Sequence, residues 1–254
     1  MQDTQAYKEK KAFFESLITV YGRNVVLEML QDKSIDFYKV HMAESNRQDG
    51  VVKQIQALAK KRGIEVRMHT RAQLSRISKN SRQDQGVAAD IAAANYLDVD
   101  GIPAQLPESF RLLALDGIQN PQNLGMIIRS AAAGGIDGII LPKHNSAKLS
   151  PLVIKASAGT LFKIDIYHGE TLAPTLERLR ESGAEIYALS SHAKEDIYTL
   201  KTGGMSVFVL GNESEGVSDE VQAVCTGSVS IPMNRGVESL NVAVTAALIA
   251  FMKG

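Results

Sequence analysis

The sequence contains a single cysteine, Cys225, among its 254 residues. It therefore cannot form an internal disulfide, and such scarcity is typical of proteins in a reducing cytosol. No apolar run reaches the roughly 20 residues that a membrane-spanning helix needs. The N-terminal stretch MQDTQAYKEKKAFF has neither an apolar signal core nor a cleavage site. We therefore expect a cytoplasmic protein with no membrane partner.

Metal-binding and nucleotide-binding signatures are also missing. The five histidines are scattered, and none stands at metal-ligand spacing with a second ligand, so no metal site is predicted. No G-x-G-x-x-G, Walker loop or G-x-S-x-G follows a predicted strand. The sequence thus indicates neither a dinucleotide-binding fold, nor a P-loop ATPase, nor an α/β-hydrolase.

The chain has no net charge, but its charges are unevenly distributed. Residues 1–100 hold 16 basic and 13 acidic side chains, whereas residues 101–254 hold 12 and 15. Between Lys53 and Arg82 there are nine basic residues and one acid, Glu65. Such a cluster can follow a phosphate backbone. A solvated basic face on a small domain explains it equally well.

Two α/β halves are predicted from the apolar periodicity. Residues 1–96 form a small domain, with strands at 37–43, 65–70 and 86–92 and helices at 24–30 and 51–63. Residues 97–109 contain two prolines, a glycine and little periodicity, and are predicted to be a linker. Residues 110–254 alternate short apolar strands with helices, which favours a parallel sheet. The strands are expected at 111–118, 137–142, 162–167, 184–190, 206–211 and 228–232, and the helices at 123–135, 150–159, 171–182, 218–225 and 239–252.

Ligands of open α/β sheets bind beyond the carboxyl ends of the strands, where this sequence has unusual loops. In VLGNESEGVS, Glu213 and Glu215 lie on a tight loop between Gly211 and Gly216. One of these carboxylates could accept a proton or hold a ligand; a solvated acidic turn is the plainer interpretation.

The stretch SIPMNRGVESLN follows another predicted strand. The apolar residues Ile231 and Met233 suit the rim of a site for a flat ring such as adenine. Ser239 and Asn241 either cap the last helix or face a pocket. That helix is apolar on nearly every side, which favours burial between the sheet and something else, such as a partner subunit.

A third stretch, NPQNLGMIIRSAAAGG, places Arg129 among apolar and small residues. Its guanidinium either extends past the alanines to water or faces an anionic group on a substrate.

These three stretches together resemble the three ordered motifs of the SpoU (TrmH-like) branch of the SPOUT methyltransferases, over about the last 145 residues. The first half resembles that family's RNA-binding domain, which is related to a ribosomal protein. The segments YGRNVVLEML and QDQGVAAD carry this second resemblance. Asp84 stands where the family pattern often has a histidine.

The resemblance implies transfer of a methyl group from S-adenosylmethionine to a ribose 2′-hydroxyl in RNA. It also implies a homodimer formed through the C-terminal domain, and a deep trefoil knot that involves residues 210–216 and 231–241. Cofactor binding is implied for Leu210, Gly211, Asn212, Gly216, Ile231, Met233, Ser239 and Leu240. Arg129 corresponds to the family's catalytic arginine, accompanied by Asn123, Glu213 and Asn241. RNA contacts are expected from Arg23, Lys60, Lys61, Arg62, Arg71 and Arg82.

The expected mechanism follows from the chemistry of arginine, which keeps its proton at neutral pH. Arg129 is expected to hold a phosphate and stabilise the developing alkoxide, while Glu213, the phosphate or water receives the proton. The expected substrate is 23S ribosomal RNA, with a guanosine as the candidate target. Transfer RNA, a non-catalytic RNA-binding role and a small-molecule enzyme remain as alternatives.

Overall fold

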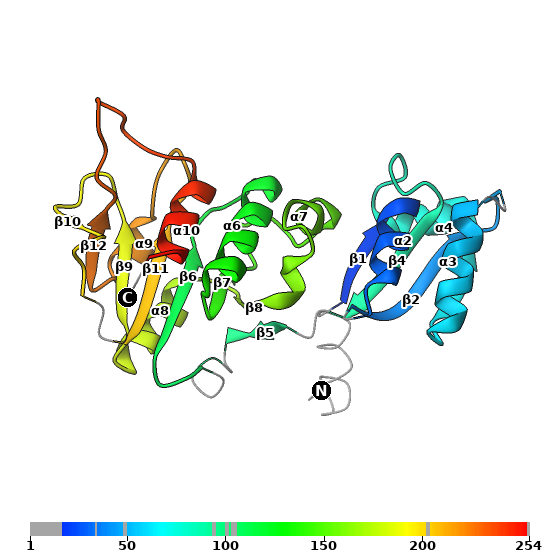
Figure 1. Cartoon of the computed structure of the whole chain (residues 1–254), viewed down its shortest axis with the longest axis horizontal. Helices are drawn as coiled ribbons and strands as arrows, with labels where there is room; N and C mark the ends of the chain where they lie inside the picture. The colour runs from blue at the N-terminus through cyan, green and yellow to red at the C-terminus, as the bar shows by residue number, and fades with distance from the viewer. Residues whose placement is uncertain are drawn as a thin grey trace, which may run out of the picture. The chain divides into compact units, whose positions relative to one another are not determined.

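The computed structural model describes residues 17–33, 35–47, 50–92, 95–99, 102, 106–201 and 204–252. The chain forms two compact units, Met1–Ala94 and Asn95–Gly254, and each is described by itself (Figure 1). Among the described residues, no helix is both long and apolar enough to cross a membrane.

The first unit is a four-stranded sheet with helices packed against it. Its strands are β1 (Leu17–Tyr21), β2 (Asp36–Ala43), β3 (Glu65–His69) and β4 (Val87–Ala92), in the order β1-β4-β2-β3. β4 runs antiparallel to β1 and β2, and β3 runs parallel to β2. The helices are α2 (Arg23–Gln31), α3 (Gly50–Lys61) and α4 (Arg71–Ser78). The sequence predicts all of these elements except β1 and α4.

The second unit contains an eight-stranded sheet in which every neighbouring pair is parallel, which confirms the predicted fold class. The order is β10-β12-β9-β11-β6-β7-β8-β5. The strands are β5 (Tyr96–Asp98), β6 (Phe110–Leu115), β7 (Gly138–Pro142), β8 (Asp165–Gly169), β9 (Glu185–Leu189), β10 (Glu195–Asp196), β11 (Met205–Leu210) and β12 (Gly227–Ser230). The helices are α6 (Pro121–Gly134), α7 (Pro151–Ala156), the 3-10 helix η2 (Thr160–Lys163), α8 (Ala173–Glu181), α9 (Asp219–Gln222) and α10 (Val242–Ala250).

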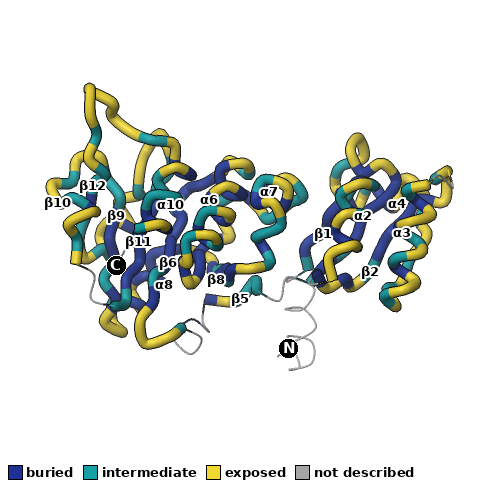
Figure 2. The backbone as a smooth tube through the Cα atoms, in the orientation of Figure 1, coloured by how far each residue is buried: buried dark blue, intermediate teal, exposed yellow. Residues whose placement is uncertain are grey.

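Helices cover both faces of this sheet, so its central strands are buried on both sides (Figure 2). α8 and α9 contribute Leu176 and Val221 to a core shared with the central strands. α6 packs between α7 and α10. Two glycines permit this close packing, because a Cβ on Gly125 would lie 2.4 Å from the Ala156 Cβ and one on Gly134 would lie 2.6 Å from the Ala250 backbone.

α6 shows how the local sequence fixes an element that carries site residues. The Asn120 side chain accepts hydrogen bonds from the backbone nitrogens of Gln122 and Asn123, and Pro121 occupies the first turn. Gly135 ends the helix in the left-handed region, at φ 77°. The helix therefore begins directly after the carboxyl end of β6, with Asn123 in its first turn.

The boundary between the units lies slightly before the predicted linker of residues 97–109. Leu97 and Asp98 belong to β5, which pairs with β8 at the edge of the large sheet. They are therefore part of the second unit rather than of a linker. Residues 100, 101 and 103–105 of that predicted linker lie outside the described residues.

Candidate functional site

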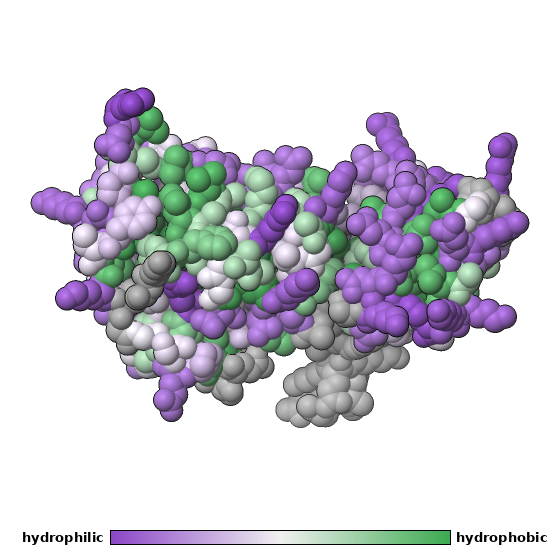
Figure 3. Space-filling model, viewed as in Figure 1, coloured by the Kyte–Doolittle hydropathy of each residue, from purple (hydrophilic) through white to green (hydrophobic). Residues whose placement is uncertain are grey.

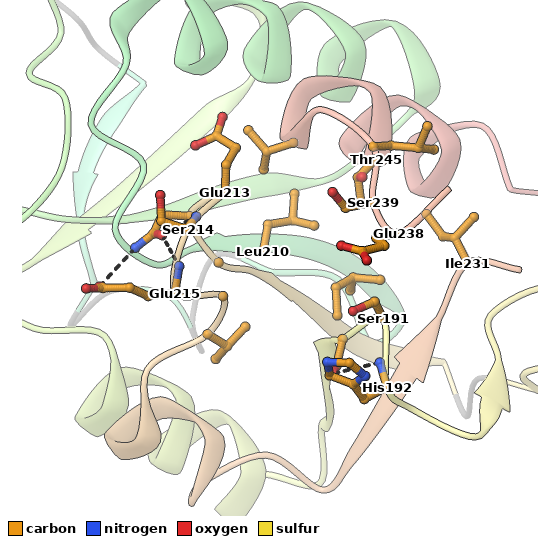
Figure 4. A pocket seen from close by; sticks show the side chains of 18 of the residues that line it. Ser191, His192, Leu210, Glu213, Ser214, Glu215, Ile231, Glu238, Ser239 and Thr245 are labelled. Atoms are coloured by element: carbon orange, nitrogen blue, oxygen red, sulfur yellow. Dashed lines mark hydrogen bonds between the residues drawn. The ribbon is translucent and has the colours of Figure 1, made fainter. Parts of the chain in front are cut away.

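A cavity of about 480 Å³ lies at the carboxyl ends of the strands in the second unit (Figure 4). Three loops and the start of α10 surround it. They are the loops that follow β9, β11 and β12. Its lining comprises Leu189, Ser190, Ser191, His192, Leu210, Gly211, Asn212, Glu213, Ser214, Glu215, Gly216, Val217, Gln222, Ile231, Met233, Glu238, Ser239, Leu240, Val242 and Thr245.

Every residue that the sequence assigns to cofactor binding lines this cavity. These are Leu210, Gly211, Asn212, Gly216, Ile231, Met233, Ser239 and Leu240. The wall combines apolar side chains with hydroxyl, amide, imidazole and carboxylate groups, and the volume is in the range of small-molecule sites. The cavity is therefore suited to a molecule of nucleoside size that has both apolar and polar edges.

The loop after β11 is held in shape by Asn212. Its Oδ1 accepts hydrogen bonds from the backbone nitrogens of Ser214 (2.9 Å) and Glu215 (2.7 Å), and its carbonyl accepts one from Gly216 (3.0 Å). A Cβ on Gly211 would lie 2.0 Å from the Gly216 carbonyl carbon, so only glycine permits the loop to close so tightly. Asn212 thus shapes the wall of the cavity through this turn.

Glu213 is linked to α6 and α10 by a chain of amides. Asn123 Nδ2 donates to Glu213 Oε1, and Asn241 Nδ2 donates to Asn123 Oδ1 at 3.2 Å. The Asn241 Oδ1 meanwhile accepts from the Ala243 nitrogen at 2.9 Å and caps α10. Asn123 is 7% exposed, so this chain is shielded at its centre. The structure thus brings together three of the four residues predicted to be catalytic.

Arg129 stands apart from these residues. It is exposed on α6 and does not line the cavity. Six residues separate it from Asn123, which places it about 9 Å further along the helix axis and on another side of the helix. Together with Gln122, Met126 and Ala133, it forms the exposed face of α6.

Sequence reasoning missed the part of the wall that follows β9. Ser190, Ser191 and His192 line the cavity there. Figure 4 shows Ser191 close to Glu238, which comes from the loop after β12. The position of this loop could have indicated it, because the loop also follows the carboxyl end of a predicted strand. Its residues do not form a recognisable motif, so nothing singled them out.

The residues predicted to bind RNA come from several different elements of the first unit. Arg23 and Arg71 line a second, smaller cavity in the first unit. Arg62 lies at the other end of α2, where its guanidinium donates to the carbonyl oxygens of Leu30 (3.0 Å), Asp32 (3.0 Å) and Ile35 (2.5 Å). Lys60 and Lys61 are exposed in the last turn of α3, and Arg82 is exposed between α4 and β4.

The single cysteine takes no part in the cavity. Burial raises the pKa of the Cys225 thiol to about 11, and its Sγ donates to the Val221 carbonyl oxygen at 3.2 Å. It therefore remains a protonated thiol at neutral pH. Within the described ranges, no group of three or more His, Cys, Asp or Glu side chains is arranged to hold a metal ion.

Fold and site together define a class of protein: a parallel α/β domain with a nucleoside-sized cavity at its strand ends, preceded by a small α/β domain rich in basic residues. Comparison with known families is consistent with this class. The SpoU rRNA Methylase family model matches residues 111–251, and the model for RNA 2′-O ribose methyltransferase substrate binding matches residues 19–97. The chain belongs to the SpoU rRNA methylase family.

Similar proteins span nearly the same length. A putative TrmH family tRNA/rRNA methyltransferase, YacO, of Bacillus subtilis is 34% identical, over 91% of this chain and 93% of its own. The 23S rRNA (guanosine-2′-O-)-methyltransferase RlmB of Xanthomonas campestris is 32% identical, over 91% and 94%. Among solved structures, the SpoU methyltransferase AviRb of Streptomyces viridochromogenes, in complex with AdoMet, has a TM-score of 0.70 at 22% identity, covering 98% of this chain and 92% of its own.

Proposed function

We propose that this protein transfers a methyl group from S-adenosylmethionine to a ribose 2′-hydroxyl of 23S ribosomal RNA in the cytoplasm, with a guanosine as the target nucleoside. The observation that carries the proposal is the convergence of all eight expected cofactor residues on one cavity, with Glu213 in the same wall. A similar protein that acts on 23S rRNA matches this chain along both of its units.

The cavity residues fit the cofactor. Leu210, Ile231 and Met233 offer apolar surface for an adenine ring, and the hydroxyl of Ser239 offers a polar contact. When bound, the cofactor supplies an electrophilic methyl group on a sulfonium centre. The remaining work, which is to align the 2′-oxygen and accept its proton, belongs to the protein and the RNA.

Glu213 is the proton acceptor in this proposal. Asn123 holds one carboxylate oxygen, and Asn241 holds Asn123, so the carboxylate keeps one orientation. Held in this way, the Glu213 carboxylate would accept the proton of the 2′-hydroxyl, and the bound cofactor would supply the methyl group. Asn123 and Asn241 act as positioning residues, since they reach the reacting atoms through Glu213.

In this proposal Arg129 contributes to the cavity of a second copy of the chain rather than to its own. Its face of α6 also exposes Met126 (41%), the adjacent α10 exposes Val244 (47%), and Phe251 (63%) follows directly after α10. Figure 3 shows apolar surface over α10 and α6. A homodimer that buries this surface would bring Arg129 towards the cavity of the partner copy, where its guanidinium can bind the RNA phosphate beside the reacting ribose. The trefoil knot that involves residues 210–216 and 231–241 is part of the same proposal.

The direct test is transfer of labelled methyl groups from S-adenosylmethionine to bulk bacterial RNA, followed by nucleoside analysis. A 2′-O-methylguanosine in 23S RNA is the expected product. If label appeared only in transfer RNA, the substrate would be transfer RNA rather than 23S ribosomal RNA. Absence of transfer, together with retained RNA binding, would favour a non-catalytic RNA-binding protein. Glu213→Gln, which keeps the shape and loses the base, is the matched variant and should transfer little.

A mixing experiment tests the contribution of Arg129 to the partner's cavity. Arg129→Ala and Gly211→Val should each be inactive as homodimers. When the two variants are co-expressed and the mixed dimer is purified, one cavity is intact and faces an intact arginine, so activity should return. If the mixed dimer is inactive while both chains are folded, Arg129 serves its own chain or no site at all.

A further inference from the structure

The first unit contains a cavity that the methyl-transfer site does not use. It measures about 350 Å³ and is formed by the start of α2, the loop after β2, the start of α4 and the loop before β4. All of its lining side chains carry N–H or O–H donors, and two are guanidinium groups: Arg23, Ser45, Asn46, Arg71 and Gln85. No carboxylate is among them, so the cavity suits an anionic oxygen ligand.

Arg23 is held in a fixed orientation. Its Nε donates to the Gln85 carbonyl oxygen at 2.9 Å, and its Nη2 donates to Asn46 Oδ1 at 3.2 Å. Its backbone nitrogen donates to Gln85 Oε1 at 3.1 Å. Because the guanidinium is already ordered, binding a ligand costs little side-chain entropy.

Arg71 is oriented by a buried carboxylate. Its Nη2 pairs with Asp84 Oδ1 at 3.1 Å, and Asp84 is 0% exposed. The same carboxylate accepts from the Gly86 nitrogen (2.9 Å) and the Ser78 hydroxyl (2.9 Å). Asp84 thus fixes the loop and the arginine at once, and the two guanidinium groups with this carboxylate carry one net positive charge.

Gly86 allows the two loops that line the cavity to approach each other closely. Its φ is +81°, and a Cβ there would lie 2.0 Å from Asn46 Oδ1. Asn46 Nδ2 in turn donates to the Gly86 carbonyl oxygen at 2.7 Å. The loop after β2 and the loop before β4 are therefore joined across the cavity, which gives it a defined shape rather than that of a chance gap between surface side chains.

We propose that this cavity binds one phosphodiester group of the RNA strand, with Arg23 and Arg71 as its ligands and Asp84 as the positioning residue of Arg71. The proposal rests on the proposed function, because it assigns that function's RNA to one point on the first unit. It also divides the basic cluster in two: Arg62 lies at the far end of α2, about 12 Å from Arg23 along the axis, and belongs to the scaffold.

The test uses the full chain and filter binding to a 23S ribosomal RNA transcript at several salt concentrations, without cofactor. Arg23→Gln and Arg71→Gln should each weaken binding about tenfold and make the slope of log K against log salt about one unit less negative. Arg76→Gln is the matched control, since it removes the same charge from the exposed side of α4 and does not line the cavity. It should stay within about twofold. Equal losses in all three variants would overturn the proposal.

Asp84 is tested through its coupling to Arg71. Asp84→Asn should weaken RNA binding in the wild-type background and change it less than about twofold in the Arg71→Gln background, because residues that act through one another are not additive. An equal effect in both backgrounds would overturn its positioning role. Thermal melting shows whether each variant is folded.

The RNA-binding measurements and the methyl-transfer assay fail independently. If RNA binds through this cavity but no methyl group is transferred, the proposed function is wrong and the phosphate site stands. If methyl groups are transferred and the Arg23 and Arg76 variants bind RNA alike, the phosphate site alone is wrong.

Discussion

Asn123 connects three elements through one amide, since it donates to Glu213 and accepts from Asn241. Asn123→Ala leaves the carboxylate without its fixed orientation. We expect kcat to fall about 100-fold, in the range of general-base effects, with the affinity for the cofactor nearly unchanged. Steady-state kinetics with RNA, beside isothermal titration with the cofactor, measure both.

Gln122→Ala is the control for Asn123, because its side chain is on the exposed face of the same helix turn. A kcat that stays within twofold of wild type in Asn123→Ala would show that the amide chain does not serve catalysis.

Arg62 illustrates a basic residue whose charge has a structural use. Its three hydrogen bonds satisfy carbonyl oxygens at the end of α2 and in the loop before β2. Arg62→Ala should lower the free energy of unfolding by about 2 kcal/mol, because three carbonyl oxygens lose a charged donor and two of these hydrogen bonds are partly buried. Urea denaturation measures the loss. Lys61→Ala, with an exposed side chain, should cost almost nothing, and similar losses in the two variants would contradict this assignment.

At the residue scale, the sequence predicted the kinds of side chain better than their partners. All eight residues predicted to bind the cofactor line one cavity, because motif residues at strand ends share one edge of a parallel sheet. The partner of Arg62 could not be predicted, because it consists of backbone carbonyls from a distant segment. The exposure of Arg129 could not be predicted from the sequence either. The small residues around it do not show which sides of α6 are covered by neighbouring elements and which side is open to solvent.

Among the elements, the loop after β11 depends on Gly211 having no Cβ atom. A Cβ on Gly211 would collide with the backbone of Gly216 and with the Val217 nitrogen, at 2.0 and 2.2 Å. In Gly211→Ala the loop must shift, so we expect cofactor affinity to fall at least about 100-fold, equivalent to about 2.7 kcal/mol. Isothermal titration measures this.

Gly50→Ala provides the comparison for Gly211→Ala, since no atom lies within 4 Å of its Cβ position and α3 tolerates alanine. Unchanged cofactor binding in Gly211→Ala would mean that the loop is not part of the cofactor site.

At the scale of elements, each strand and helix predicted for the second unit overlaps an observed one, because each is a short apolar run or a periodic one. The strand predicted at 162–167 begins only at Asp165, since Thr160–Lys163 form η2. The edge strands β5 and β10 were missed, since two or three residues at an edge carry no pattern. α4 was missed because its sequence, RAQLSRIS, is mostly polar. It is specified instead by Thr70 and Gln73, whose side chains form a capping box.

For the whole molecule, tyrosine and cysteine side chains with raised pKa values predict a loss of stability at alkaline pH. Burial raises the pKa of Tyr167 and of Tyr187 to about 12, and that of Cys225 to about 11, from 10.0, 10.0 and 9.0. The unfolded chain therefore releases these protons first. Stability is fully present below pH 9 and should fall progressively between about pH 9 and 12.

Urea midpoints at pH 8, 9.5 and 10.5 measure this trend. Tyr187→Phe combined with Cys225→Ala should flatten it, because two of the three groups no longer titrate. A midpoint that is constant over this range would contradict the prediction.

The exposed apolar face of α6 and α10 predicts the state of assembly. Phe251→Glu places a charge on a side chain that is 63% exposed in one chain and that the proposed dimer would bury. We expect a folded monomer by light scattering, with methyl transfer lost and cofactor binding retained. Arg178→Glu, on α8 on the other side of the sheet, is the control and should remain dimeric. A dimeric, active Phe251→Glu would show that this face is not the interface.

The position of Asn95 decides where the chain can be cut. Its carbonyl oxygen accepts from the Ile166 nitrogen at 2.7 Å, and its Nδ2 donates to the carbonyls of Leu161 and Ile164, both at 2.5 Å. A truncation placed inside residues 97–109, as sequence composition suggests, would remove these bonds and strip β5 from β8. β8 would then be an exposed edge strand, which can pair with strands of other molecules and lead to aggregation. Expression of the methyltransferase half alone should therefore begin no later than Asn95.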